Sequence, residues 1–166
     1  MKDEKLREKR MVYYKEDFDQ IEKLMEEYLK LSNSRCVFLI DKEGHLVTQR
    51  GMTQTFNAET LSALVAGAFA ATKEMARLLG ETEFTVMFHQ GKKDNIHLSL
   101  VGDRSIVATV FDEKTTVGMV NLYSKELTGK LVRIFEIALK RQPQEQPMEA
   151  DYSDSVQNRL DDMFKE

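Results

Sequence analysis

One run of five residues constrains the fold of this chain more than any other segment. Cys36-Val-Phe-Leu-Ile40 is apolar at every position, and the turn-forming tetrapeptide Asp41-Lys-Glu-Gly44 follows it. A strand with one face in water alternates apolar and polar residues, so a strand that lacks this alternation is covered on both faces. We therefore predict a strand inside a sheet that has helices on both of its faces.

Neighbouring segments supply the rest of that sheet. Some alternate apolar and polar residues, as half-buried strands do, and others repeat apolar residues with the helical period. The predicted strands cover residues 35–41, 45–50, 84–88, 96–100 and 105–112, and the predicted helices cover residues 17–32, 57–80 and 115–141. The fold class is thus α/β (an α+β sandwich), a five-stranded antiparallel sheet with the order α-β-β-α-β-β-β-α.

The helix predicted between Asn57 and Gly80 has two different sides. Asn57 is a good N-cap residue, and Gly80 can adopt the left-handed conformation that ends a helix. One side gathers larger apolar residues and is predicted to face the core: Leu61, Leu64, Val65, Ala68, Thr72, Met75, Ala76 and Leu79. The other side carries small residues that would let another backbone approach closely: Ala63, Ala66, Gly67 and Ala70. Helix propensity alone would also favour alanine at these positions.

Composition and charge narrow the function. The 166 residues are 42% hydrophobic, which is enough for one domain with a core. A net charge of −4 provides no basic surface, and this disfavours nucleic acid as a partner. The single cysteine, Cys36, is predicted to be a buried thiol. The charged amino terminus is unlike a signal peptide, and no apolar run approaches the ~18 residues of a membrane span, so we expect a cytoplasmic protein.

The two ends of the chain differ from the domain predicted over residues 11–141. Residues 1–10 are charge-dense and are predicted to be a disordered lead-in. Residues 142–150 hold two prolines and are predicted to be a linker. Residues 151–166 are predicted to form an acidic amphipathic tail helix whose apolar residues share one side: Val156, Leu160, Met163 and Phe164. Because so short a helix is marginal alone in water, it should dock, either on a partner or back on its own domain.

The sequence contains no recognisable catalytic or metal-binding motif. Gly91-Lys92-Lys93 lacks the upstream glycine and the following hydroxyl residue of a phosphate-binding P-loop. There is no G-x-S-x-G, no H-E-x-x-H and no Cys/His metal spacing. His89 and His97 could be diagonal neighbours across a hairpin, but two histidines without a third ligand are a weak signal. The sequence therefore favours a binding or regulatory domain with no catalytic residues, metal or cofactor of its own.

The chain resembles the roadblock (dynein light chain) family in three segments: Val37–Gly44, Ala66–Ala71 and Phe111–Gly118. The similarity runs from about Met11 to Arg141. It is strongest to the bacterial branch of the family that regulates a small Ras-like GTPase, because of four shorter segments: Met11–Tyr14, Glu83-Phe84, Phe88–Gly91 and Leu160–Phe164.

That resemblance implies a homodimer whose sheets join edge to edge, with two copies of the chain for each GTPase. It implies that the paired 57–80 helices form a platform for the GTPase, at Ala63, Ala66, Gly67, Ala70, Ala71 and Glu74. The GTPase would carry GTP and Mg²⁺, and it would be activated through its own catalytic residues, in cell polarity and gliding motility at a cell pole. The tail would promote nucleotide exchange through Val156, Leu160, Met163 and Phe164.

Two other functions remain open on the sequence. A roadblock dimer can be a scaffold that binds a GTPase without activating it. A mixed helix-and-sheet domain of this size can also be a ligand sensor of the PAS or GAF kind, which needs a hollow lined by apolar and a few polar groups. The two predicted strands that are apolar on both faces, at residues 36–40 and 106–111, favour close packing over such a hollow.

Overall fold

The computed structural model describes residues 13–141. The predicted lead-in at residues 1–10, the linker at 142–150 and the tail helix at 151–166 lie outside these residues. The chain divides into two compact units, and residues Tyr14–Ile134 form the larger one. In the other unit, the rings of Tyr13 and Phe135 meet edge to face with centroids 5.7 Å apart.

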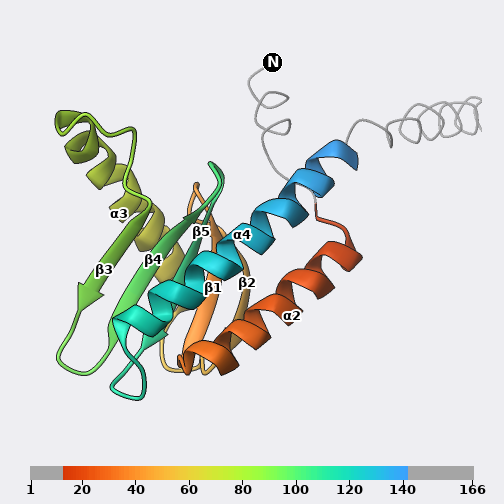
Figure 1. The fold of residues 1–166 in the computed structure, drawn as a ribbon, viewed down its shortest axis with the longest axis horizontal. Coiled ribbons are helices and arrows are strands. Elements are labelled where there is room, and N and C mark those ends of the chain that lie inside the picture. The colour runs from red at the N-terminus through yellow and green to blue at the C-terminus, as the bar shows by residue number, and fades with distance from the viewer. Residues whose placement is uncertain (1–12, 142–166) are drawn as a thin grey trace, which may run out of the picture. The chain divides into compact units, whose positions relative to one another are not determined.

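The larger unit has the predicted order of elements (Figure 1). Its strands are β1 (Cys36–Asp41), β2 (Leu46–Gly51), β3 (Val86–Gln90), β4 (Asn95–Val101) and β5 (Ser105–Phe111). Its helices are α2 (Lys15–Ser32), α3 (Ala58–Leu78) and α4 (Val117–Arg141), the last of which continues into the smaller unit. The predicted fold class, a five-stranded antiparallel sheet with helices on both faces, is confirmed.

The sheet has the strand order β2-β1-β5-β4-β3, and all of its pairings are antiparallel. β1 lies between β2 and β5, so the prediction that the Cys36–Ile40 run is an interior strand is confirmed. Its five apolar residues are buried, and Cys36 is 1% exposed, as predicted for a structural thiol. β2 and β3 are the two edges of the sheet in the described part of the chain.

Helices cover the sheet on both sides (Figure 1). The side under α3 holds an apolar cluster in which Val65 and Phe69 of the helix meet the sheet residues Cys36, Phe38, Ile40, Leu98, Ile106, Ala108 and Val110. α2 and α4 lie over the opposite side. There, the Tyr28 hydroxyl of α2 lies 2.7 Å from the Thr109 hydroxyl of β5. Close packing on both sides makes the sheet a rigid support for the helix surfaces that face outward.

Two polar pairs join α4 to β4. Nε2 of His97 lies 3.3 Å from Oδ1 of Asn121, and the hydroxyl groups of Ser99 and Ser124 are 2.8 Å apart. His97 is fully buried, and this burial lowers the pKa of its imidazole below the ordinary value. The idea that His89 and His97 are neighbours is wrong, because His89 pairs with Ile96 and therefore points to the other face of the sheet.

The ends of α3 are those predicted from sequence. The Asn57 side chain accepts a hydrogen bond from the backbone N–H of Thr60 at 3.0 Å, which satisfies one of the free donors of the first turn. Gly80 follows the helix with φ at +82°, a conformation that glycine adopts without strain. None of the helices in the described residues is long and apolar enough to cross a membrane.

Candidate functional site

α3 is rotated about its axis relative to the orientation predicted from sequence. The residues that it buries are Ser62, Val65, Ala66, Phe69 and Ala76. The predicted core face was wrong at three of its large residues, because Leu64, Met75 and Leu79 are 66%, 58% and 74% exposed. The helix is apolar on more than one side, so periodicity alone did not identify the side that faces the sheet.

The turn between β1 and β2 explains this rotation. Gly44 stands so close to α3 that a Cβ placed on it would lie 3.0 Å from the Cα of Ala63 and 3.5 Å from the Cβ of Ala66. A larger side chain at Ala66 would collide with the turn. Small residues on this flank of α3 therefore do admit another backbone, as predicted, but that backbone belongs to the chain's own turn.

Four of the six residues predicted to form the platform lie in one exposed row along α3. We call this row, Ala63, Gly67, Ala70 and Glu74, the small stripe. Its spacing of three and four residues keeps its members on one side of the helix. Ala71 is also exposed, next to this row, whereas Ala66 is 8% exposed and packs inward. The structure thus removes Ala66 from any docking surface and leaves the other five available.

The small stripe carries little charge. Its carboxylate, on Glu74, is paired with the guanidinium of Arg77 at 3.0 Å, and both side chains are about two-thirds exposed or more. An exposed pair of this kind contributes little to stability, on the order of 0–1 kcal/mol. The rest of the row offers backbone and methyl groups without long side chains. Such a surface suits the close approach of another protein's backbone.

A second exposed row on α3 was missed by the sequence analysis. We call it the apolar stripe: the exposed Leu64, Ala71, Met75 and Leu79, together with the half-buried Ala68. These residues recur every three or four positions, as in a helix that packs against another helix. The spacing is visible in the sequence, but four of these residues were predicted to face the core, and Ala71 was predicted to belong to the platform. Leu78, at 88% exposure, extends the apolar surface at the end of the helix.

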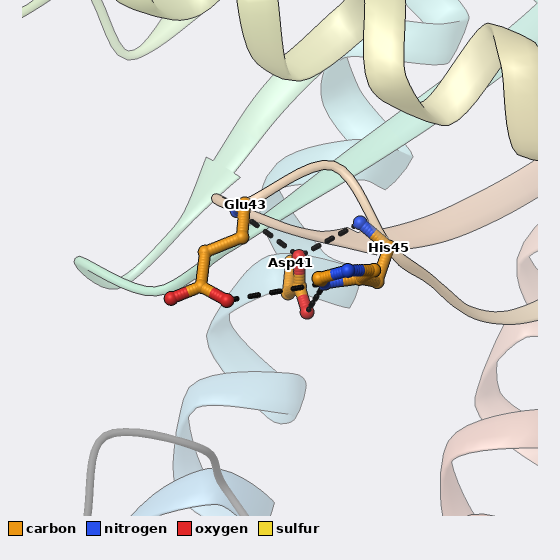
Figure 2. Close-up of polar contacts among 3 residues, drawn as sticks. All are labelled: Asp41, Glu43 and His45. Carbon is orange, nitrogen blue, oxygen red and sulfur yellow. Dashed lines mark hydrogen bonds and ion pairs between the residues drawn. The ribbon is translucent and has the colours of Figure 1, made fainter. Parts of the chain in front are cut away.

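The β1–β2 turn beside the small stripe brings three polar side chains together, as Figure 2 shows: Asp41, Glu43 and His45. Their potential ligand atoms lie within 4.8 Å of one another. Asp41 already has a structural task, since its Oδ1 accepts the backbone N–H groups of Glu43 and His45 at 3.0 and 2.8 Å. Its Oδ2 lies 3.1 Å from Nδ1 of His45. These bonds fix the turn in the shape that places Gly44 against α3.

The predicted tail residues, Val156, Leu160, Met163 and Phe164, lie outside the described residues. They remain predictions from the sequence.

Comparisons with known proteins give a consistent result. The Roadblock/LC7 domain family matches residues 20–111 of the 166. The gliding protein MglB of Thermus thermophilus is 32% identical with a TM-score of 0.71, over 76% of this chain and 96% of that one. MglB of Myxococcus xanthus is 38% identical with a TM-score of 0.69, over 72% of this chain and 97% of that one.

A third MglB structure, described as having a tetrameric arrangement, is 31% identical with a TM-score of 0.72, over 77% of this chain and 96% of that one. A search of curated protein sequences gave no match. The similarity to solved structures therefore covers the described sheet and helices together, and not one motif alone.

Proposed function

Because the chain belongs to the Roadblock/LC7 family, we propose that it is a GTPase-activating partner of a small Ras-like bacterial GTPase of the MglA type. One observation carries this proposal: the sequence of this chain is 31–38% identical to three MglB structures, and the match covers 96–97% of each of those chains. We place the GTPase on the small stripe of α3, the exposed row with the fewest bulky side chains. Two copies of the chain form a homodimer and receive one GTPase.

Activation of this kind needs no catalytic residue from the regulator. The platform stimulates hydrolysis if it binds the reactive conformation of the GTPase more tightly than the idle one, because a ligand shifts an equilibrium only by its difference in affinity. GTP and Mg²⁺ are held by the GTPase. The rigid support under α3 makes such selection effective, since a surface that does not adapt distinguishes better between two shapes of its partner.

The tail is assigned a second role in this proposal. Residues 151–166 dock on the GTPase through their apolar side and favour exchange of its nucleotide, in cell polarity and gliding motility at a cell pole. One relative, from Thermus, is itself described as a gliding protein. The tail's acidic character fits a basic groove on the partner.

A scaffold that binds the GTPase without activating it is the alternative function. It uses the same surface, and the rate of GTP hydrolysis with and without the chain separates the two functions. A ligand sensor of the PAS or GAF kind has less support, because every residue of β5 and the five apolar residues of β1 are buried against neighbouring elements. On the α3 side, these strands form one apolar cluster with Val65 and Phe69 of the helix, which favours close packing over a ligand-lined hollow.

Binding measurements test the proposal directly. The full chain is titrated into the fluorescently labelled GTPase, loaded either with GDP or with a non-hydrolysable GTP analogue. We expect clearly tighter binding to the GTP form, by tenfold or more. Equal affinity for the two forms would contradict a regulator that selects the reactive state.

A further inference from the structure

One strand of the sheet has an uncovered face. On the side where α2 and α4 lie, the two helices cover the other strands and leave β3 open (Figure 1). Phe88 pairs with His97 and Val86 pairs with Ser99, so each side chain faces the same side of the sheet as its partner. His97 and Ser99 both contact α4, which places Val86 and Phe88 beside that helix. We call these two residues, which are 40% and 39% exposed, the β3 face.

The β3 face is a firm apolar surface. The ring of Phe88 is stacked on the ring of Phe111, with centroids 5.9 Å apart and 22° between the ring planes. Phe111 is 2% exposed and thus anchors the stack in the core. An aromatic ring that is supported on one side and open on the other offers a large contact to an apolar side chain.

The surroundings of the β3 face are basic. Lys92 and Lys93 are exposed in the hairpin turn that follows β3. Lys125 is exposed on α4, one turn after Asn121 and on the same flank of the helix, which contacts β4. Within the described part of the chain, no carboxylate forms an ion pair with any of these three lysines. A segment that fits here is apolar on one side and acidic elsewhere.

We propose that the chain's own tail, residues 151–166, docks on the β3 face when no GTPase is bound. The predicted tail helix has an apolar side, and its five acidic and two basic residues give it a net charge of −3. This charge complements the three lysines. The inference rests on the proposed function for what the tail does after its release, and it adds the site that holds the tail before that.

The tail is long enough to reach the β3 face. Asn121, which marks the position of this face along α4, precedes Arg141 by 20 residues, or about 30 Å along the helix axis. Residues 142–155 connect Arg141 to Val156, and 14 extended residues span up to about 46 Å. The two prolines of the predicted linker cannot continue the helix of α4, which permits the chain to turn back.

The spacing of the apolar residues also agrees. Val86 and Phe88 are alternate residues of a strand, about 6.6–6.8 Å apart. Leu160 and Phe164 are four positions apart in the predicted tail helix, or about 6 Å along its axis. Leu160 and Phe164 can therefore each cover one side chain of the β3 face.

Docking on the β3 face would regulate the tail. The proposed function assigns the same apolar side of the tail to the GTPase, and one side of a helix cannot contact both surfaces at once. The free chain thus holds its tail, and nucleotide exchange requires transfer of the tail to the GTPase. The small stripe does not compete for the same space, because α3 packs on the opposite side of the sheet (Figure 1).

Amide hydrogen exchange in the full chain without GTPase, followed by mass spectrometry, tests the docking. We expect residues 156–164 to exchange at least about tenfold more slowly than in a free peptide of residues 151–166. Phe88→Gln should remove this protection, because it replaces the apolar contact with a polar side chain. His89→Gln is the matched control, because it changes the next residue of the same strand, on the other face of the sheet.

A second pair of variants tests the charges. Lys125→Glu should weaken the protection, whereas Lys23→Glu, which changes an exposed lysine of α2, should not. Higher salt should weaken it as well. Tail amides that exchange at the free-peptide rate in the wild-type chain would overturn the docking. Protection that survives both Phe88→Gln and Lys125→Glu would overturn the site.

Release of a fluorescent nucleotide from the GTPase tests the function of the tail separately. Phe88→Gln frees the tail and should therefore raise the release rate above that of the wild-type chain, by about twofold or more. Release that neither chain stimulates would contradict the proposed role of the tail on the GTPase. The docking itself is decided by hydrogen exchange in the chain alone, so the two failures are distinguishable.

Discussion

Gly44 of the β1–β2 turn stands against the backbone of Ala63 in α3, so that a Cβ on Gly44 would lie 3.0 Å from the Ala63 Cα. Its φ of +95° is also unfavourable for any residue with a side chain. This contact fixes the rotation of α3 and thus decides which of its rows of residues face outward. In this way, one glycine in the β1–β2 turn positions the candidate docking surface.

Gly44→Ala should destabilise the fold for these two reasons together. We expect a loss of about 1–3 kcal/mol in the free energy of unfolding, measured by urea denaturation. Gly67→Ala is the matched control, because a Cβ at Gly67 has no atom within 4 Å and the position is helical. It should gain up to about 1 kcal/mol. Equal effects of the two substitutions would show that Gly44 does not hold the turn against α3.

Arginine substitutions on α3 should separate folding from binding. Ala66→Arg forces a charged side chain into a buried position against the turn and should destabilise the fold by several kcal/mol. Ala70→Arg is exposed and should leave the melting temperature nearly unchanged while weakening GTPase binding at least about tenfold, or 1.4 kcal/mol. Normal binding by a folded Ala70→Arg chain would move the docking surface away from the small stripe.

The fold was predictable because the signals for it are local. A few neighbouring residues were enough to predict the interior strand at Cys36–Ile40, the start of α3 at Asn57 and its end at Gly80. The exposed surface of α3 was harder to predict, because Leu64, Met75 and Leu79 are as apolar as the residues that do face the sheet. The contact of Gly44 with Ala63 decides which apolar residues of α3 face outward. This contact joins two separate elements, so the periodicity of the helix sequence does not predict it.

His97 should make the stability of the fold depend on pH. Burial lowers the pKa of its imidazole in the folded state below its ordinary value of 6.5. The unfolded chain therefore binds the proton more readily, and stability falls as the pH drops below about 6.5, by at most about 1.4 kcal/mol per pH unit for this one group. Urea denaturation at a series of pH values measures this. His97→Gln should flatten the curve in this range, and an unchanged slope would exclude His97 as its source.

Deletion of Asp151–Glu166 should leave the dimer mass intact, weaken the complex with the GTPase modestly and slow nucleotide exchange. Leu160→Ala combined with Phe164→Ala should reproduce most of that effect because both belong to the predicted apolar side of the tail. Asp161→Ala should do less, and higher salt should weaken the contact because the tail is acidic. Release of a fluorescent nucleotide from the GTPase measures exchange. A rate that does not change on deletion would remove the tail from the site.

GTP turnover by the Ras-like GTPase, measured with and without this chain, tests the central claim most directly. The account predicts that the full chain raises the single-turnover hydrolysis rate at least tenfold, and that Ala70→Arg, which folds normally, does not. It also predicts a maximum at two copies of the chain for each GTPase. A chain that binds the GTPase but leaves its hydrolysis rate unchanged would be a scaffold, and this result would contradict the proposed activation.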